Sequence, residues 1–161
     1  VEGDTRSRFA GTRTWTPDIK RLGWRFHLSN IMAAIGRVQL ARLEPEFIPA
    51  RRALAAQYAS LLGELPHLAL LETDPEDFIV PHILPVRILD GRKDAFKAAM
   101  EAQGIPTGVH YKPNHLHSFF AAPPLPVCER LYAELVTLPL HPGLSAEDVE
   151  AVCRAAREAL I

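Results

Sequence analysis

Two prolines interrupt the longest stretch of helical spacing in this chain of 161 residues. The apolar stripe that precedes them consists of Leu28, Ile31, Ile35 and Val38. Residues three and four apart share one face of a helix, so this stripe predicts a helix that begins near Ser29 or Asn30. A proline inside a helix removes a hydrogen bond and clashes with the preceding turn, so Pro45 and Pro49 predict an end near Leu43.

A second helix is expected to follow at once. Proline is tolerated in the first turn of a helix, so this helix can begin around Pro45. Its apolar face, again at helical spacing, consists of Phe47, Ala50, Leu54, Tyr58, Leu61 and Leu65. The sequence therefore predicts a long bent helix pair over residues 28–65.

Short β-rich segments alternate with helical segments in the second half of the chain. Strands are predicted at 79–88, 107–111 and 136–140, and helices at 93–103, 127–135 and 146–160. Pro81 and Pro85 indicate an edge position for the first strand, because proline cannot donate to a sheet. Ser145 and Asp148 have the spacing of a capping box at the start of the last helix. The predicted fold class is α/β (α+β-like), with a small, mainly antiparallel sheet covered on one side by helices over residues 78–161.

Composition argues against several classes of function. The net charge of -1 gives no electrostatic basis for binding nucleic acid or an anionic membrane. No apolar run approaches the roughly 20 residues that span a bilayer, and no secretion-signal pattern is present, so a cytoplasmic location is expected. Cys128 and Cys153 fall in segments with helical spacing and are expected to be small core residues.

Three histidines lie close together in the sequence: His110, His115 and His117. Imidazole nitrogens are common zinc ligands, so a metal site is one interpretation. Neither cysteine lies nearby, and Pro113 restricts the loop between the first two histidines, so we favour hydrogen-bonding side chains at the rim of a pocket. No nucleophile motif or phosphate-binding glycine loop accompanies them.

Arg25 and His27 form the second candidate site. In an extended segment these two side chains lie on one side, and Trp24 and Phe26 lie on the other. Cationic groups next to a helix N-terminus suit an anion such as phosphate. An exposed basic loop held in place by the two aromatic side chains is the simpler alternative.

Three segments resemble one known family. They are Gly23–Leu40 (GWRFHLSNIMAAIGRVQL), Gly104–Tyr111 (GIPTGVHY) and Leu138–Ser145 (LPLHPGLS). In this order they are similar to segments of the sugar aminotransferases of the DegT/DnrJ/EryC1/StrS family. The resemblance covers the chain from about Gly23 to its end.

The resemblance implies the C-terminal domain of a fold-type I aminotransferase over residues 28–161. Residues 1–27, which begin with Val1 rather than Met, would be an irregular lead-in from a missing N-terminal cofactor domain. Enzymes of this family carry pyridoxal phosphate on a lysine, take an amino group from a donor such as glutamate, and aminate a keto sugar attached to a nucleotide. They are typically homodimers, and the cofactor acts as the electron sink.

Two residues depart from the family pattern. Arg25 stands where the family has an asparagine that reaches toward the cofactor phosphate of the neighbouring subunit, and His27 stands where the family has an arginine. Arginine binds phosphate strongly, so the resemblance implies a cofactor contact for Arg25. It places His27, His110, Tyr111 and His115 on the substrate side of the pocket.

The lysines of this chain do not match the family's cofactor lysine, which lies well upstream of Gly23. They are Lys20, Lys93, Lys97 and Lys112. Without a lysine that forms the Schiff base, we expect the chain alone not to transaminate. The alternative is a non-catalytic truncated relative that serves as a dimerisation or ligand-binding domain.

Overall fold

A computed structural model of the chain describes residues 28–74, 77–120 and 122–161. The predicted lead-in over residues 1–27, with Arg25 and His27, lies outside the described residues. The domain limits expected from the sequence therefore stay a prediction.

The chain divides into two compact units after Val38. The second unit, from Gln39 to Ile161, contains the sheet and the hydrophobic core. Among the described residues, no helix has both the length and the apolar character required to span a bilayer.

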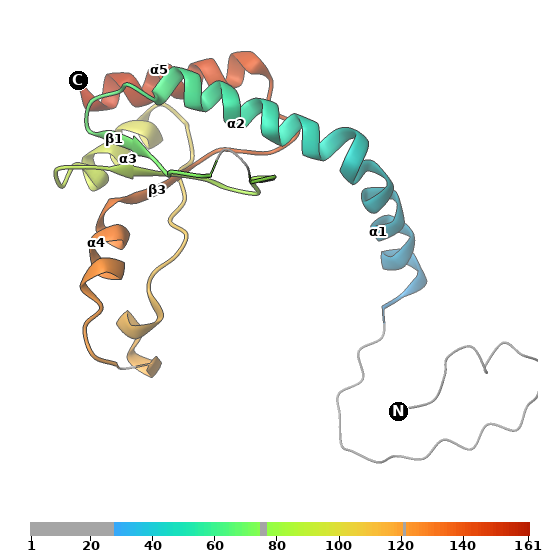
Figure 1. Cartoon of the computed structure of the whole chain (residues 1–161), viewed down its shortest axis with the longest axis horizontal. Helices are drawn as coiled ribbons and strands as arrows, with labels where there is room; N and C mark the ends of the chain where they lie inside the picture. Colours follow the sequence, from blue (N-terminus) through green and yellow to red (C-terminus); the bar gives the residue numbers. More distant parts are fainter. Residues whose placement is uncertain (1–27, 75–76, 121) are drawn as a thin grey trace, which may run out of the picture. The chain divides into compact units, whose positions relative to one another are not determined.

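The predicted helix pair forms, with a π-helical turn at its centre (Figure 1). Helix α1 spans Asn30–Arg42, the π-helical turn η2 spans Leu43–Phe47, and α2 spans Ile48–Leu62. The Ile48 N–H donates to the Leu43 carbonyl, five residues back, and this wider turn accommodates Pro45, which has no N–H to donate. The second helix thus begins at Ile48 rather than at Pro45, with Pro49 in its first turn.

Three antiparallel strands form one sheet, in the order β1-β2-β3. They are β1 (Leu68–Leu70), β2 (Leu84–Ile88) and β3 (Leu135–Leu138). The sequence prediction does not include β1, because three residues are too few to show an alternating pattern. The strand predicted at 107–111 is also wrong: in the described part of that segment, only an isolated bridge between Gly108 and Thr137 forms.

The edge position predicted for the strand within residues 79–88 is wrong, because β2 is the central strand. Pro85 lies opposite Thr137, whose N–H and C=O both bond to Gly108 on the other side. In the pairing of β2 with β1, the last pair is Val86 with Leu70, and Pro85 lies beyond it. The missing N–H of Pro85 therefore costs no ladder hydrogen bond.

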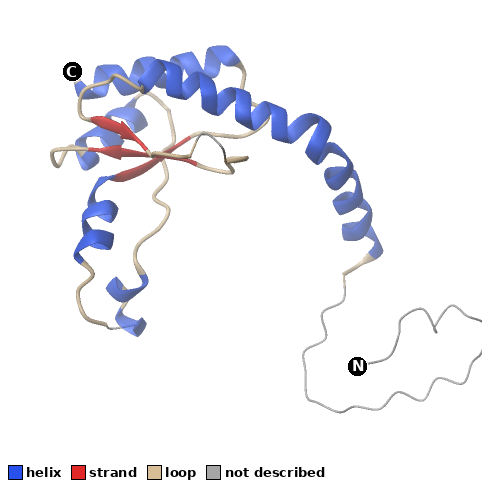
Figure 2. Ribbon diagram, viewed as in Figure 1, coloured by secondary structure: helices blue, strands red, loops and turns tan. Residues whose placement is uncertain are grey.

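The other helices agree with the prediction to within one residue at most ends. They are α3 (Lys93–Ala102), α4 (Pro126–Glu134) and α5 (Ala146–Leu160), with short 3₁₀ turns η3 (Asn114–Leu116) and η4 (Ser118–Phe120). Gly104 follows α3 with a φ of 73°, a left-handed conformation that favours glycine at a helix end. Helices dominate the secondary structure around the small sheet (Figure 2).

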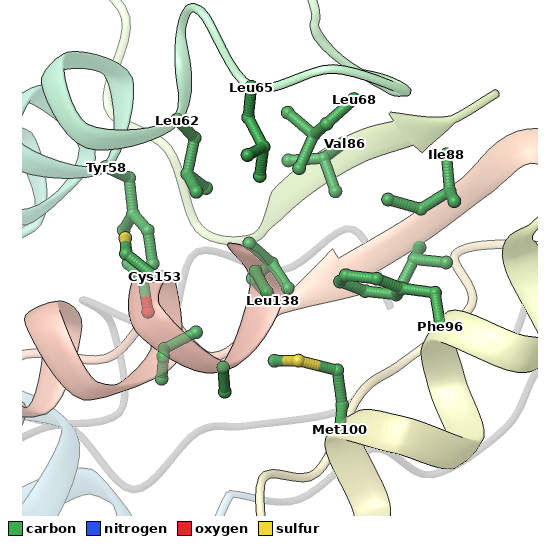
Figure 3. Packing of buried hydrophobic residues seen from close by; sticks show 14 of the residues in the cluster. Tyr58, Leu62, Leu65, Leu68, Val86, Ile88, Phe96, Met100, Leu138 and Cys153 are labelled. Atoms are coloured by element: carbon green, nitrogen blue, oxygen red, sulfur yellow. The ribbon is translucent and has the colours of Figure 1, made fainter. Parts of the chain in front are cut away.

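The core lies between one face of the sheet and helices α2, α3 and α5 (Figure 3). Tyr58 and Leu62 of α2, and Phe96 and Met100 of α3, are fully buried. The inward positions of β2 and β3 and the apolar face of α5 complete this core with Val86, Ile88, Val136, Leu138, Val149, Val152, Cys153, Ala155, Ala156 and Leu160.

Helix α4 contacts the opposite face of the sheet. Arg87 lies between the inward-facing Val86 and Ile88 on β2, so its side chain points away from the core, to the face that α4 contacts. There its guanidinium pairs with the Glu134 carboxylate of α4 at 2.7 Å. The sheet is thus covered by helices mainly on one side, as the sequence predicted.

The cap of α5 supports a first prediction. The Asp148 N–H donates to the Ser145 hydroxyl at 3.1 Å, and the Ser145 N–H donates to the Asp148 carboxylate at 2.9 Å. We expect Ser145→Ala to lower the free energy of unfolding by about 1 kcal/mol, the usual cost of losing a capping side chain, as measured by urea denaturation. An unchanged midpoint would contradict this role.

The same cap is expected to weaken in acid. The hydrogen bonds from the backbone and then the side chain of Ser145 hold the pKa of Asp148 below its ordinary value of 3.8. The contribution of the carboxylate is therefore complete at neutral pH and is lost as the pH falls through that lowered pKa.

The two cysteines differ, although the sequence predicts both in the core. Cys153 is buried, and burial raises the pKa of its thiol to about 11. Cys128 is exposed, so the prediction of a core position for Cys128 is wrong. Its helix, α4, has no fully buried residue. The thiolate is the reactive form, so iodoacetamide at neutral pH should modify Cys128 and spare Cys153, as peptide mass mapping would show. Equal modification of both in the folded chain would contradict the burial of Cys153.

Candidate functional site

A hollow of about 420 Å³ opens beside β3, where the sheet ends. Three stretches of the chain line it: His82 and Ile83 before β2, residues 106–108 with His110, and residues 137–141. Two of these stretches belong to the segments Gly104–Tyr111 and Leu138–Ser145. The fold thus brings together two sequence motifs that lie about 30 residues apart in the chain.

His110 is fixed against the sheet at this hollow. Its Nδ1 lies 2.8 Å from the Thr137 hydroxyl, and the backbone of Gly108 exchanges two hydrogen bonds with that of Thr137, at 2.8 and 2.9 Å. A Cβ on Gly108 would lie 2.7 Å from the His110 ring, so only glycine allows the imidazole to fold back this closely. This arrangement commits Nδ1 to Thr137 and leaves Nε2 as the ring nitrogen that can meet a ligand.

Tyr111 lies beside His110 but points to solvent. The two rings make an edge-to-face contact with centroids 4.8 Å apart, and Tyr111 is 72% exposed. The phenol can therefore donate or accept hydrogen bonds outside the hollow.

His115 occupies a different place, against α4. Only 6% of its side chain is exposed, and its Nε2 lies 3.0 Å from the Glu129 carboxylate. Glu129 also accepts the Leu125 N–H at 3.0 Å, and this bond, together with that from His115, lowers the pKa of Glu129. His115 thus links the η3 turn to the start of α4, and its predicted contact with substrate stays a prediction.

The described residues do not support the zinc interpretation of the three histidines. No group of three or more histidine, cysteine or acidic side chains in this part of the chain lies close enough to hold a metal ion. His110 and His115 instead bond to two different partners, Thr137 and Glu129.

Sequence reasoning missed four residues at the hollow. Thr137 orients His110, while His82 and His141 contribute two further imidazoles to the lining. Arg51 of α2 donates to the backbone carbonyls of His82 and Leu140, two residues of the lining. Of these four residues, His141 alone lies in a segment that the sequence had already singled out, Leu138–Ser145.

The sequence model of one family, the DegT/DnrJ/EryC1/StrS aminotransferase family, matches residues 3–157. The chain belongs to this family. The match extends over almost the whole chain and confirms the resemblance based on three short segments. The DegT/DnrJ/EryC1/StrS segments Gly104–Tyr111 and Leu138–Ser145 are those that line the hollow.

Individual relatives agree with the family match. One is dTDP-4-dehydro-2,3,6-trideoxy-D-glucose 4-aminotransferase from Saccharopolyspora spinosa, which is 33% identical over 145 residues, or 89% of this chain and 37% of the relative. The structure of the aminotransferase TlmJ from Streptoalloteichus hindustanus is similar, with a TM-score of 0.84 and 33% identity over 92% of this chain and 41% of TlmJ. DesV from S. venezuelae, solved in complex with a ketimine intermediate, gives a TM-score of 0.82 and 34% identity over 94% of this chain and 41% of DesV.

The chain therefore has the fold of the C-terminal part of fold-type I aminotransferases of the DegT/DnrJ/EryC1/StrS family. It spans only 37 to 41% of the length of these relatives. Activity depends on residues from the whole enzyme, so the similarity of this part establishes family and fold.

Proposed function

We propose that this chain is the C-terminal region of a pyridoxal-phosphate-dependent aminotransferase that aminates a nucleotide-linked keto sugar. The observation that carries the proposal is the hollow itself, which gathers two family motifs and presents His110 bonded to Thr137 of β3. The name of the Saccharopolyspora spinosa relative, an aminotransferase of a dTDP-linked dehydro sugar, supports this substrate class.

His110 and Tyr111 are the residues best placed to meet the substrate. The Nε2 of His110 and the hydroxyl of Tyr111 can hydrogen-bond to sugar hydroxyl, carbonyl or phosphate oxygens. His115 and His27 are retained as proposed substrate contacts, and Arg25 as a contact to the cofactor phosphate.

Enzymes of this family depend on pyridoxal phosphate, which withdraws electrons from the substrate carbon when bound. We propose that none of the described lysines is its attachment point. Lys97 and Lys112 do not line the hollow. Lys93 donates to the Tyr132 carbonyl and lies over the Tyr132 ring, where it joins α3 to α4. We therefore assign no chemical step through the cofactor to the described residues, and we propose that the lysine belongs to an N-terminal cofactor domain.

The remaining partners follow from the family. We propose a homodimer that uses an amino donor such as glutamate and acts in the cytoplasm. The net charge of -1 is compatible with a small-molecule substrate and gives no basis for a nucleic acid partner.

The proposal is tested with the protein encoded by the complete reading frame that contains this chain. With pyridoxal phosphate, glutamate and a dTDP-linked 4-keto sugar, it should form 2-oxoglutarate and an aminated sugar nucleotide, detected by mass. His110→Gln should lower this rate, whereas His67→Gln, a histidine before β1, should leave it unchanged. A reading frame without a lysine-bearing cofactor domain, or no amination of any nucleotide-linked keto sugar, would overturn the proposal.

The second candidate is a non-catalytic relative that binds a ligand or a second subunit. None of the described residues that line the hollow is a lysine, which is compatible with this candidate for the chain alone. Borohydride treatment of the 161-residue chain with pyridoxal phosphate decides between covalent attachment and none. A cofactor fixed to one lysine, identified by peptide mass mapping, would count against the non-catalytic candidate.

A further inference from the structure

Arg51 bonds to three backbone carbonyls from two segments of the chain that are distant in sequence. Its Nη1 lies 2.9 Å from the His82 carbonyl, 3.3 Å from the Pro81 carbonyl and 3.3 Å from the Leu140 carbonyl. Arg51 is half-buried on α2, directly before the buried part of that helix. Its guanidinium therefore joins the segment that enters β2 to the segment that leaves β3.

The position of this contact follows from the register of the sheet. The last pair between β2 and β3 is Leu84 with Leu138. Two residues further along the same register, His82 would lie opposite Leu140, but these residues form no pair in the sheet. Instead, the guanidinium of Arg51 donates to both carbonyls. It holds the two segments together where the ladder has ended.

Two prolines lie in the segments where this pairing ends. Pro81 and Pro139 flank the two segments and have no N–H to donate. Their carbonyls find side-chain donors on α2: Arg51 bonds to Pro81, and the Tyr58 hydroxyl bonds to Pro139 at 2.9 Å. Side chains of α2 thus bond to backbone carbonyls of both segments beyond the end of the ladder.

Both segments held by Arg51 contribute an imidazole to the hollow. His82 offers its own carbonyl to Arg51, and His141 directly follows Leu140. The Nδ1 of His141 accepts the Gly143 N–H at 3.2 Å, so in the neutral imidazole Nε2 carries the proton and can donate to a ligand. None of the described residues that line this hollow carries a carboxylate, so an anionic group meets no like charge from them.

We propose that Arg51 is a positioning residue that sets His82 and His141 for binding the diphosphate of a nucleotide sugar. This inference rests on the proposed function, because it takes the nucleotide sugar as the ligand. Arginine suits the task, since its planar guanidinium presents several donors in fixed directions, whereas a lysine ammonium on a flexible stem does not.

The test uses three variants of the 161-residue chain. Arg51→Met removes the donors, Arg51→Lys restores a charge and single donors, and Arg52→Met is the matched control. Arg52 neighbours Arg51 on α2, but its exposed guanidinium lies over the Phe78 ring, 4.4 Å from the centroid, and Arg52 does not line the hollow. NMR signals of the histidine rings and titration with dTDP are recorded for each variant, with His67 as the distant reference.

Arg51→Met is expected to shift the ring signals of His82 and His141 and leave that of His67 in place. It should weaken dTDP binding about tenfold, which corresponds to one hydrogen bond from a displaced imidazole to the diphosphate. Arg51→Lys should recover part of the affinity, and Arg52→Met should change neither readout. If Arg51→Met does not fold, Arg51→Gln replaces it with the same readouts.

The outcomes separate this inference from the proposed function. Normal dTDP affinity and unmoved His82 and His141 signals in a folded Arg51 variant overturn the positioning role and leave the proposed function intact. Shifted signals in a chain whose wild type does not bind dTDP overturn the ligand assignment, while Arg51 still positions the two histidines. Equal effects of Arg52→Met also overturn the inference.

Discussion

Phe96→Ala should lower the free energy of unfolding by about 3–5 kcal/mol, the range for removal of a buried aromatic ring. Phe96 is 0% exposed, and it points from α3 toward the sheet next to Met100 (Figure 3). The ring joins the helix to the inward face of β2, where Ile88 is also fully buried. Its removal leaves a cavity that the surrounding side chains cannot fill without strain.

Urea denaturation monitored by circular dichroism gives the size of this effect. Phe119→Ala is the matched control, because Phe119 is 87% exposed in the η4 turn. This substitution removes the same atoms, but from a surface site. We expect the control to change the free energy by less than about 0.5 kcal/mol. Similar losses for the two variants would show that the core does not lie between α3 and the sheet.

Tyr58→Ala is expected to have the second largest effect, again about 3–5 kcal/mol for the loss of a buried aromatic side chain. Tyr58 is 0% exposed at the contact between α2 and α5. Burial, and then the nearby Cys153 and Asp148, raise the pKa of its phenol, so the hydroxyl stays protonated as the donor to Pro139. The substitution removes both the ring and that donor.

Tyr58→Phe separates the two contributions. It keeps the ring and leaves the Pro139 carbonyl without its donor, which should cost about 1 kcal/mol. Because Pro139 lies in the wall of the hollow, this variant should also perturb the ring signal of the adjoining His141. A stability as low as that of Tyr58→Ala would mean that the hydroxyl, rather than ring packing, dominates at this position.

Much of the helical structure was predictable from the sequence. The apolar spacing around Tyr58 and Phe96 identified α2 and α3, and the capping box at Ser145 located the start of α5. These signals are local, since each depends on residues within a few turns of one helix. The family could also be recognised from three short segments, and the match over residues 3–157 confirms it.

The strands were less predictable because their arrangement depends on distant residues. Pro85 indicates an edge strand by its own chemistry, yet it lies in the central strand because Gly108 takes the hydrogen bonds of Thr137. β1 pairs through only three residues, which show no periodicity in the sequence. Sheet order is set by pairings that no local pattern contains.

The candidate site divides in the same way. His110 and Tyr111 could be proposed because they lie in a recognisable segment. His141 also lies in such a segment, but His82 and Arg51 do not. Their proximity to the site arises from β2–β3 pairing and from a contact between α2 and two loops. The structure also places His115, which the sequence groups with His110, against Glu129 instead.

The short edge of the sheet has a consequence for aggregation of the purified chain. β1 presents only three residues for pairing with another strand, and the far side of β3 is engaged at Thr137 by Gly108. Long, exposed edges promote the addition of strands from other molecules. The edge at β1 is short, and the edge at β3 is partly occupied. The apolar surface of α1 is different, since it exposes Ile31, Met32 and Ile35 by 53 to 75%. In the part of the chain that the structure describes, association would therefore arise from helix surfaces and produce amorphous precipitate, rather than ordered fibrils built from the strands.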